Sequence, residues 1–450
     1  MNPETRTFVT PEPAIIPREQ HVISRKNISK AALRVLYRLH DAGYDAFLVG
    51  GAVRDLLLGG HPKDFDIATN ATPDEVKKLF RNCRLIGRRF RLAHVVFGPE
   101  IIEVATFRGT GEDAPGEGDR HIVDGLIVRD NVWGSIEEDA IRRDFRVNAL
   151  YYDISDFSVR DYVGGMQDLQ DRALHLIGDP ATRYREDPVR MLRAARLAAK
   201  LGFTIDPKAS APFEELGPLL GDAAPARLFD ESLKMFLAGN GLKSFHVLEQ
   251  CGLLKFLFPA TARALKRGDE ALRSLVEQGL ANTDSRIAEG KSVTPAFLFA
   301  VLLWGEVRDL AHGWMAKGVD GTEAWSRAAA HVVGEQCQRV AIPRRFTLTM
   351  EEIWSLQPRF EQIQRKRVFR LMAHPRFRAA FDFLLLRAAE SPAMRELGQW
   401  WAHAQQLPQD VLAAALPASM ATPVGGSSAV ATAAPRKRRR RKPSGKSGSA

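Results

Sequence analysis

The sequence predicts an α+β fold in which a mixed sheet with helices is followed by an all-helical neck and body and by a disordered basic tail. Three observations support this prediction. Within about the first 135 residues, short apolar segments with strand-like alternation are interspersed with helical ones. Beyond residue 164, almost every segment has its apolar residues at helical spacing. Residues 421–450 contain eight Lys or Arg and neither Asp nor Glu.

The chain is expected to divide into several parts, because 450 residues are too many for one hydrophobic core. The first residues are rich in proline and have no periodicity, and Gly164-Gly165 interrupts a strand-like segment in a way that suits a hinge. The expected parts are an extended N-terminal arm (1–26), a mixed domain (27–163), a helical neck (164–265), a helical body (266–415) and a tail (416–450).

Cap and turn residues set the limits of the elements expected in the mixed domain. Ser29 suits a helix N-cap, and Gly43 suits a helix end. In chain order we expect a helix at 30–42, a strand at 45–49 that runs into Gly50-Gly51, a short helix at 52–60, a strand at 65–69, and strands at 93–98 and 100–107 paired as a hairpin.

The second part of this domain contains a loop and a helical segment. Thr110–Arg120 is Gly-rich and acidic, so it is expected to be a mobile loop. Ser135 is a candidate cap for a helical pattern that we expect to extend from 136 to 153.

The composition excludes several classes of protein. No apolar run approaches the roughly 18 residues of a membrane span, and the N-terminus has no secretory pattern, so we expect no membrane insertion. Three widely separated cysteines argue against a disulfide framework or a zinc site. These features are typical of a protein in a reducing compartment, the cytoplasm.

The net charge of +10 comes mainly from the tail. Without the eight cations of residues 421–450, 56 basic residues face 54 acidic ones. Such a tail either keeps the protein soluble or binds a polyanion such as RNA, in which case each neutralised phosphate adds salt-sensitive affinity. We favour RNA binding. The cationic run consists of Arg436, Lys437, Arg438, Arg439, Arg440, Arg441 and Lys442.

A pair of carboxylates is the first candidate for chemistry. In a strand, Asp64 and Asp66 would point to one face, and Glu103 faces out of an otherwise apolar strand. If the two strands are neighbours, three carboxylates converge and can bind two Mg²⁺ ions. The simpler alternative is a pair of solvated acids at the end of a strand.

The glycine turn favours the metal site over that alternative. Gly50 and Gly51 lead from a strand into a helix, where backbone N–H groups can approach a phosphate. A phosphate-binding turn within twenty residues of metal-binding carboxylates is the combination of groups that nucleotidyl transfer requires.

Four segments resemble the motifs of one enzyme family. They are "LVGGAVRDLLLG" with "DFDIAT", "EEDAIRRDFRVNALYYD", "YVGGMQDL" and "REDPVRMLRAARLAAKLGF". In order and spacing they resemble class II nucleotidyltransferases, the branch of the DNA polymerase β superfamily with bacterial poly(A) polymerases and tRNA CCA-adding enzymes. The resemblance covers 46–203 and weakens beyond about 265. It implies a polymerase-β-like nucleotidyltransferase head.

The resemblance also implies roles for individual residues. Asp64, Asp66 and Glu103 would be catalytic and hold two Mg²⁺ ions, or Mn²⁺ in their place. The residues implied to bind the nucleotide, ATP, are Gly50, Gly51, Arg54, Arg142, Arg143, Asp144, Asn148, Asp187 and Arg190. The sequence departs from the family at Arg146-Val147, where Thr-Ile is usual; in a helix, Arg146 would face RNA or solvent.

Two assignments have structural alternatives. Asp187 and Arg190 match the family's base-reading pair, but Asp before Pro is also a good helix N-cap, and one residue can do both. Arg88, Arg89 and Arg91 form a basic segment that either is a solvated loop or contacts the RNA primer. We expect His94 to be a buried, hydrogen-bonded histidine.

The segment 80–98 and the basic tail resemble the poly(A) polymerase branch more than the CCA-adding branch. That branch implies template-independent addition of AMP from ATP to RNA 3′ ends, in a monomer with RNA-decay proteins as candidate partners. The alternatives are a tRNA CCA-adding enzyme and a non-catalytic RNA-binding protein with a degenerate head.

Overall fold

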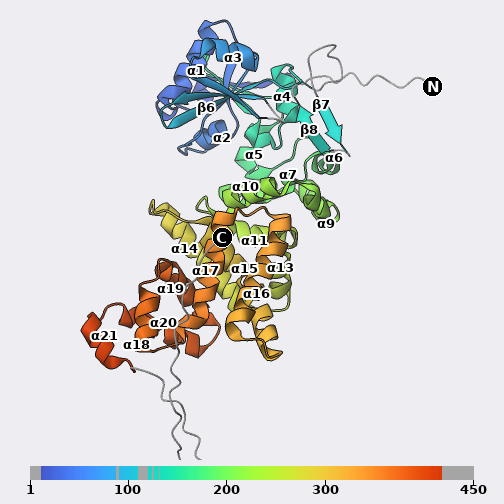
Figure 1. Cartoon of the computed structure of the whole chain (residues 1–450). Helices are drawn as coiled ribbons and strands as arrows, with labels where there is room; N and C mark the ends of the chain where they lie inside the picture. The colour runs from blue at the N-terminus through green and yellow to red at the C-terminus, as the bar shows by residue number, and fades with distance from the viewer. Residues whose placement is uncertain (1–11, 88–90, 110–119, 124–125, 131, 418–450) are drawn as a thin grey trace, which may run out of the picture.

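The computed structural model describes residues 12–87, 91–109, 120–123, 126–130 and 132–417 of the 450. Figure 1 shows an elongated molecule with the sheet-containing head at one end and a column of helices leading away from it. Among the described residues, no helix combines the length and the apolar character needed to span a bilayer.

The head is built on an eight-stranded mixed sheet with the order β1-β10-β9-β2-β3-β6-β5-β4. Only β3 and β6 pair in parallel; the other neighbours are antiparallel. The strands are β1 (Ala14–Ile16), β2 (Ala46–Val49), β3 (Asp66–Thr69), β4 (Cys83–Ile86), β5 (Leu92–Phe97), β6 (Glu100–Thr106), β9 (Leu150–Asp153) and β10 (Val159–Asp161). The predicted hairpin at Gly98 is confirmed, and Gly98 has a φ of 61°.

Part of the expected N-terminal arm belongs to the sheet. β1 is extended, as expected, but it pairs with β10 and forms an edge of the head. A second feature that we did not expect is a separate hairpin of β7 (Arg120–Val123) and β8 (Leu126–Asp130). The loop predicted at 110–120 lies outside the described residues apart from Arg120, which begins β7.

Four helices accompany the sheet: α1 (Lys30–Asp41), α2 (Gly51–Leu57), α3 (Pro73–Leu79) and α4 (Ile136–Arg142). The expected caps are present. Ser29 accepts a hydrogen bond from the backbone N–H of Ala32 at the start of α1, and Ser135 forms a capping box with Glu138 at the start of α4.

The prediction of one helical segment from 136 to 153 is wrong beyond Arg142. After α4 the chain forms a 3₁₀ turn, η3 (Arg146–Asn148), and then β9, which lies between β2 and β10. Tyr151 and Tyr152 are fully buried in this strand. Aromatic residues that are buried within a sheet favour the strand, and a four-residue apolar run cannot distinguish strand from helix by periodicity. Arg146 therefore lies in a 3₁₀ turn and not on an α-helix; it is half-exposed and lies 3.8 Å from Asp168.

One carboxylate holds the backbone turn through which the chain passes from the head to the neck. Asp161 ends β10 and accepts hydrogen bonds from the backbone N–H groups of Val163, Gly164, Gly165 and Met166 at 2.8–3.1 Å. Gly164 has a φ of 85°, which favours glycine. A Cβ on Gly165 would lie 2.3 Å from the carbonyl oxygen of Arg146, so glycine is required there too.

The rest of the described chain, up to residue 417, is mainly helical, as predicted, with one short two-stranded sheet of β11 (Ala173–Leu174) and β12 (Thr204–Ile205). The neck contains α5 (Gly165–Asp171), α6 (Pro180–Glu186), α7 (Val189–Leu201), α8 (Pro207–Ser210), α9 (Phe213–Leu216), α10 (Pro225–Phe236), α11 (Gly241–Gln250), α12 (Leu254–Leu257) and α13 (Pro259–Lys266). The body contains α14 (Glu270–Ala288), α15 (Pro295–Ala316), α16 (Gly321–Arg339), α17 (Arg344–Phe360), α18 (Arg365–Met372), α19 (Phe377–Leu386), α20 (Pro392–Ala404) and α21 (Gln409–Ala415).

The described residues contain three clusters of buried apolar residues, of which a small one, with Phe47, Phe107 and Tyr151, lies within the head. One cluster of buried apolar residues runs without a break from the head through the neck to Leu386. The end of α17 and the helices α18 to α21 surround a second, smaller cluster centred on Phe360 and Trp401. The last helices therefore pack around apolar residues of their own.

Replacement of Asp161 by Ala is expected to lower the free energy of unfolding by about 2–3 kcal/mol, because four buried or half-buried N–H groups lose their acceptor. The measurement is urea denaturation followed by tryptophan fluorescence and far-UV circular dichroism. Asp161→Asn keeps one acceptor oxygen and should lose clearly less. Equal stability of Asp161→Ala and the wild type would contradict this role.

Candidate active site

The parallel pairing of β3 and β6 places two of the predicted carboxylates side by side. Asp66 is directly opposite Glu103 in the register. The residues on either side of Glu103, Ile102 and Val104, are buried, as are Phe65 and Ile67 around Asp66. The side-chain alternation inferred from the sequence is confirmed, and both carboxylates project from the same face of the sheet.

Asp64 has a looser position than expected. β3 begins only at Asp66, so Asp64 lies in the segment that leads into the strand, and it is exposed. Among the described residues, no group of three or more His, Cys, Asp or Glu side chains is close enough to form a ready metal cage. The carboxylates thus share one edge of the sheet without being gathered around a point.

The donor set nevertheless fits a divalent cation. The pKa of Asp66 is raised to about 6, first by the loss of water around its carboxylate and then by the negative charge of Glu103, with a further contribution from Asp64. Asp66 keeps an exposed edge, so this loss of water is partial. Hard oxygen ligands that repel one another are what Mg²⁺ or Mn²⁺ binds and neutralises.

His94 continues the same row of side chains. It lies opposite Glu103 on β5, and its Nε2 is 3.3 Å from a carboxylate oxygen of Glu103. The histidine is hydrogen-bonded, as predicted, but it is half-buried and not fully buried. It lies on the side of Glu103 away from Asp66.

The glycine turn lies against Asp66. Gly50 caps α2 with a φ of 75° and a ψ of −139°, a conformation that requires glycine. A Cβ built on Gly50 would be 3.8 Å from a carboxylate oxygen of Asp66 and 3.7 Å from Nη1 of Arg143. The turn, one of the candidate metal-binding carboxylates and one arginine therefore meet at the start of α2.

Arg143 is held in place by two buried partners. Its guanidinium donates to the carboxylate of Asp139 at 3.0 and 3.1 Å and to the hydroxyl of Tyr151 at 2.9 Å. Tyr151 in turn donates to Asp139 at 2.6 Å. Although burial opposes ionisation, the charge of Arg143 keeps the pKa of Asp139 below its usual value. This fixed cation faces the glycine turn, where a phosphate would be neutralised.

Arg54 lies behind the turn and not at its surface. It is buried, donating to Asp55 at 2.6 and 2.8 Å and to the side-chain oxygen of Asn148 at 2.6 Å. Its Nη2 is 3.4 Å from the position of a Cβ on Gly51. Two residues predicted to bind the nucleotide, Arg54 and Asn148, thus support the turn from inside.

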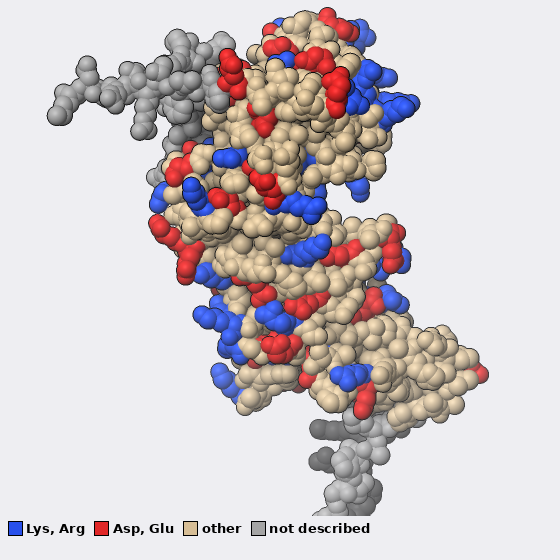
Figure 2. All heavy atoms as spheres, turned by 180° about the vertical axis from the view of Figure 1, so that it is seen from behind, with Lys and Arg blue, Asp and Glu red and all other residues tan. Residues whose placement is uncertain are grey.

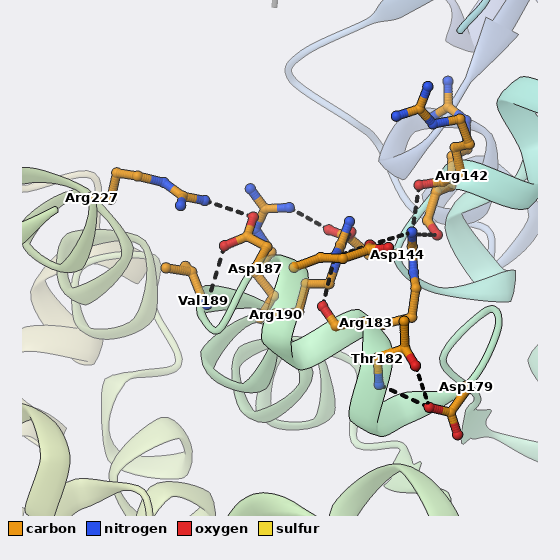
Figure 3. Close-up of polar contacts among 12 residues, drawn as sticks. Arg142, Asp144, Asp179, Thr182, Arg183, Asp187, Val189, Arg190 and Arg227 are labelled. Atoms are coloured by element: carbon orange, nitrogen blue, oxygen red, sulfur yellow. Dashed lines mark hydrogen bonds and ion pairs between the residues drawn. The ribbon is translucent and has the colours of Figure 1, made fainter. Parts of the chain in front are cut away.

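Asp144 lies at the junction of the head and the neck (Figure 3). Its carboxylate accepts hydrogen bonds from Nε of Arg190 at 2.6 Å and from Nη1 of Arg193. Burial alone would raise the pKa of Asp144, but the two arginines lower it strongly. Asp144 therefore docks α7 onto the head. Because two arginines engage this carboxylate, its predicted contact with the nucleotide would be indirect, and that contact stays a proposal.

Arg183 forms a second link across the same junction. Its Nη2 donates to the carbonyl oxygens of Arg142 at 2.7 Å and of Arg143 at 2.9 Å, and so it caps the C-terminus of α4 (Figure 3). The side chain of Arg142 donates to the carbonyl oxygen of Gly109. The position of Arg143 is thus coupled to α6.

The predicted base-reading pair is buried in the neck and engaged in ion pairs. Asp187 accepts from Arg227 at 2.8 Å, and Arg190 donates to Asp144 and to Glu186. The capping alternative is supported only in part. Asp187 accepts from the backbone N–H of Val189 at 3.3 Å, but α7 begins at Val189 with Pro188, and not Asp187, as its N-cap residue. Burial would raise the pKa of the Asp187 carboxyl, but the ion pair with Arg227 lowers it. The net result is a pKa below the usual value.

Sequence reasoning missed the basic face of α7. Arg190, Arg193, Arg196 and Lys200 recur at helical spacing, and each bonds to an acidic residue elsewhere: Asp144, Glu231 or Asp55. The spacing was visible in "VRMLRAARLAAK", but the acidic partners are 35 to 145 residues away.

The predicted RNA contacts are mostly outside the described residues: Arg88, Arg89 and the run Arg436–Lys442. Arg91 is described. It is exposed and paired with Asp74 at 3.2 Å, so it is open to solvent at the end of the basic segment.

Comparison with known proteins agrees with this geometry. Three family models match the chain: "Poly A polymerase head domain" at 46–175, "Probable RNA and SrmB-binding site of polymerase A" at 202–265, and "Polymerase A arginine-rich C-terminus" at 317–444. The poly(A) polymerase I of Salmonella typhi is 55% identical over 88% of this chain and 86% of its own. A CCA-adding enzyme of Lactobacillus johnsonii is 36% identical over 50% of this chain and 54% of its own.

The fold has the same relatives. The crystal structure of the Bacillus stearothermophilus CCA-adding enzyme in complex with CTP matches with a TM-score of 0.56 and 25% identity, covering 83% of this chain and 82% of that one. The nucleotidyltransferase head and helical column predicted from the sequence are thereby confirmed. Three family models match along its length, and a relative is 55% identical over 88% of the chain, so the chain belongs to the poly(A) polymerase family.

Proposed function

We propose that this chain is a polynucleotide adenylyltransferase that adds AMP from ATP to RNA 3′ ends without a template. The observation that carries the proposal is the register of β3 and β6, which sets Asp66 beside Glu103 at the glycine turn. In the reaction, the 3′-oxygen of the RNA forms a bond to the α-phosphorus of ATP. The bond from that phosphorus to the β-phosphate oxygen breaks, and pyrophosphate leaves.

The glycine turn and Arg143 are suited to the triphosphate. Gly50 and Gly51 leave backbone N–H groups accessible, and the N-terminus of α2 adds a favourable dipole. Arg143 is locked by Asp139 and Tyr151, so it supplies a cation that need not reorganise as negative charge develops. The proton of the 3′-hydroxyl is released during the attack, and the carboxylates of Asp66 and Glu103 are acceptors at this edge of the sheet.

Asp64, Asp66 and Glu103 would hold the Mg²⁺ or Mn²⁺ ions, which supply charge neutralisation and Lewis-acid polarisation of the phosphate oxygens. Arg54 and Asn148 keep the turn in shape from behind, and Asp55 links them to Lys200 of the neck. Asp187 and Arg190 lie in the neck where the adenine base would be read, with Asp144 aligning Arg190.

The assignment to AMP addition rests on the relatives. Poly(A) polymerases match this chain nearly end to end, whereas the CCA-adding enzyme of Lactobacillus johnsonii matches half of it. RNA 3′ ends are therefore the proposed acceptor and ATP the donor. Since both are found in the bacterial cytoplasm, we place the reaction there. RNA-decay proteins are proposed as further partners, because tailing marks an RNA end.

The decisive experiment is primer extension by the purified chain with Mg²⁺ and either ATP alone, CTP alone or both, on an unstructured RNA and on a tRNA that lacks its CCA end. We expect long extension with ATP on either RNA. Asp66→Asn should reduce this rate on the order of 10³-fold while RNA binding is retained; Asp222→Asn, an exposed acid of the neck, is the matched control. Addition that stops after CCA would instead establish tRNA repair, and RNA binding without any extension would establish a non-catalytic protein.

The same Asp66→Asn variant should be more stable than the wild type when metal is removed. Because the folded-state pKa of Asp66 is raised to about 6, its ionised form destabilises the native state above that pH. In EDTA, we expect a Tm higher by about 1–3 °C at pH 7–8, with the difference disappearing as the pH falls from about 6 to below 4. Mg²⁺ should stabilise the wild type more than the variant. A Tm difference independent of pH would contradict the electrostatic origin.

Nucleotide choice tests Asp187. Asp187→Asn is expected to lower kcat/KM for ATP by about 10–100-fold and to lower the ratio of ATP to CTP use, since a base-reading carboxylate is lost. Arg227→Gln breaks the same ion pair but keeps the carboxylate, so it should preserve more of this selectivity. If the two variants show the same ATP-to-CTP ratio, Asp187 acts only by pairing with Arg227.

A further inference from the structure

Four neighbouring strands of the sheet place one side chain each in a single row. Asp66 on β3 is opposite Glu103 on β6. Glu103 is in turn opposite His94 on β5, and His94 is opposite Arg84 on β4. Residues directly opposite one another on neighbouring strands project from the same face of a sheet. At ~4.8 Å between strands, the row spans about 14 Å, and it leads from the candidate metal-binding carboxylates to a cation on the edge strand.

The face that carries this row exposes apolar side chains. The opposite face of β5 and β6 is buried, since Val95 and Ile102 belong to the large apolar cluster that α1 and α3 cover. Figure 1 shows α1 and α3 on the side of the sheet away from the neck. On the row's own face, Ile86 on β4 is 39% exposed and Ile101 on β6 is 49% exposed. Two large apolar side chains therefore lie open on the side of the sheet toward the neck.

We call Arg84, Ile86, His94 and Ile101 the β4–β6 face. Arg84 is its cation. It is exposed, and within the described part of the chain its guanidinium forms neither an ion pair nor a hydrogen bond. Since His94 lies between Arg84 and Glu103, the guanidinium is two strand spacings, about 10 Å, from the carboxylates. Its charge is therefore available to an anion from outside the protein.

The groups suited to the triphosphate lie on the other side of Asp66. The glycine turn follows Val49, which is opposite Asp66 on β2. Nη1 of Arg143 is 3.7 Å from the position of a Cβ on Gly50 in this turn. Under the proposed function, the departing pyrophosphate is therefore on the β2 side of Asp66.

The geometry of the reaction then fixes the side from which the RNA arrives. In phosphoryl transfer, the attacking and leaving oxygens lie roughly in line on opposite sides of the phosphorus. With the leaving group on the β2 side of Asp66, the 3′-oxygen of the RNA must approach from the β6 side. The nucleotides that precede this oxygen then extend over β5 and β4, along the row that ends at Arg84.

The distribution of charge elsewhere makes such local contacts important. On the face of the molecule seen in Figure 2, cationic and anionic side chains are intermingled over the neck and body. The described residues of that face therefore present no broad field of one sign. The direction of an RNA end at the site thus depends on a few contacts close to the carboxylates.

We propose that the β4–β6 face binds the last nucleotides of the acceptor RNA, with a phosphate at Arg84 and a ribose or base against Ile86 and Ile101. This inference rests on the proposed function and gives its acceptor a place. His94 stays hydrogen-bonded to Glu103 and separates the phosphate contact from the carboxylates. A phosphate and an apolar surface are common to all four nucleotides, so these contacts do not depend on the sequence of the RNA.

The first test combines Arg84→Gln with RNA primers that carry one uncharged methylphosphonate at the last, second or third linkage from the 3′ end. With the unmodified primer, the KM for RNA should rise about tenfold in the variant, as for one lost charge-assisted hydrogen bond. The KM for ATP and kcat should stay close to wild type. At one of the three linkages, the methylphosphonate should raise the wild-type KM similarly and leave the variant unaffected. Multiplicative effects at all three linkages would overturn the contact.

The matched control is Arg38→Gln, which removes an exposed arginine of α1, on the other side of the sheet. It changes the net charge by the same amount, so its KM for RNA should stay close to wild type. Equal changes in both variants would overturn the proposal in favour of net charge alone. Because both arginines are exposed, far-UV circular dichroism should show both variants folded.

A crosslinking measurement without ATP separates this proposal from the proposed function. An RNA with 4-thiouridine in its last two nucleotides is irradiated with the full chain, and the crosslinked peptides are identified by mass spectrometry. We expect crosslinks in β4, β5 or β6, with a yield several-fold lower in Ile101→Ser than in Val411→Ser, a control at an exposed apolar residue of the body.

The outcomes of the crosslinking distinguish the two proposals. Crosslinks confined to the neck or body, in a chain that extends RNA, would overturn the β4–β6 face and leave the proposed function standing. Crosslinks at the β4–β6 face in a chain that extends no RNA would refute the proposed function and leave RNA binding at this face.

Discussion

The pairing of β3 with β6 is the constraint on which the rest of the site depends. It is the one parallel contact of the sheet, and it brings Asp66 beside Glu103 although they are 37 positions apart. Both strands are anchored by buried apolar residues on the opposite face. The hydrophobic packing beneath the two adjacent carboxylates therefore offsets the repulsion between them. Locally unfavourable arrangements of this kind are usual where function requires them.

The arginines around the carboxylates of Asp66 and Glu103 have different roles. Arg143 faces the glycine turn and is held by Asp139 and Tyr151. Arg54 is buried behind the turn, and Arg190 and Arg193 dock the neck on Asp144. Arg143 is placed to meet the triphosphate of the proposed reaction, and Arg190 is the arginine proposed to read the base. A mutation of Arg54 or Arg193 would act on the ligand through a neighbour.

The sequence was sufficient for features that depend on local pattern. Alternation placed Asp66 and Glu103 on one face, and cap residues located the starts of α1 and α4. The sequence was insufficient where packing between distant residues determines the structure. The strand β9 looked helical because the four-residue apolar run 149–152 has no diagnostic period. The ion pairs of α7 join residues up to 145 positions apart. The same limit applies to Arg54, whose burial depends on Asn148, 94 positions away.

The hydrogen bonds from Arg183 to the carbonyl oxygens of Arg142 and Arg143 couple movements of the neck to movements of the head. The guanidinium of Arg183, from the middle of α6, holds the backbone that carries Arg143. If the neck tilts relative to the head, it must either move this backbone with it or break the hydrogen bonds from Arg183. The neck is thus mechanically coupled to the glycine turn. Under the proposed function, a base that binds poorly in the neck would displace the charge of Arg143 at that turn.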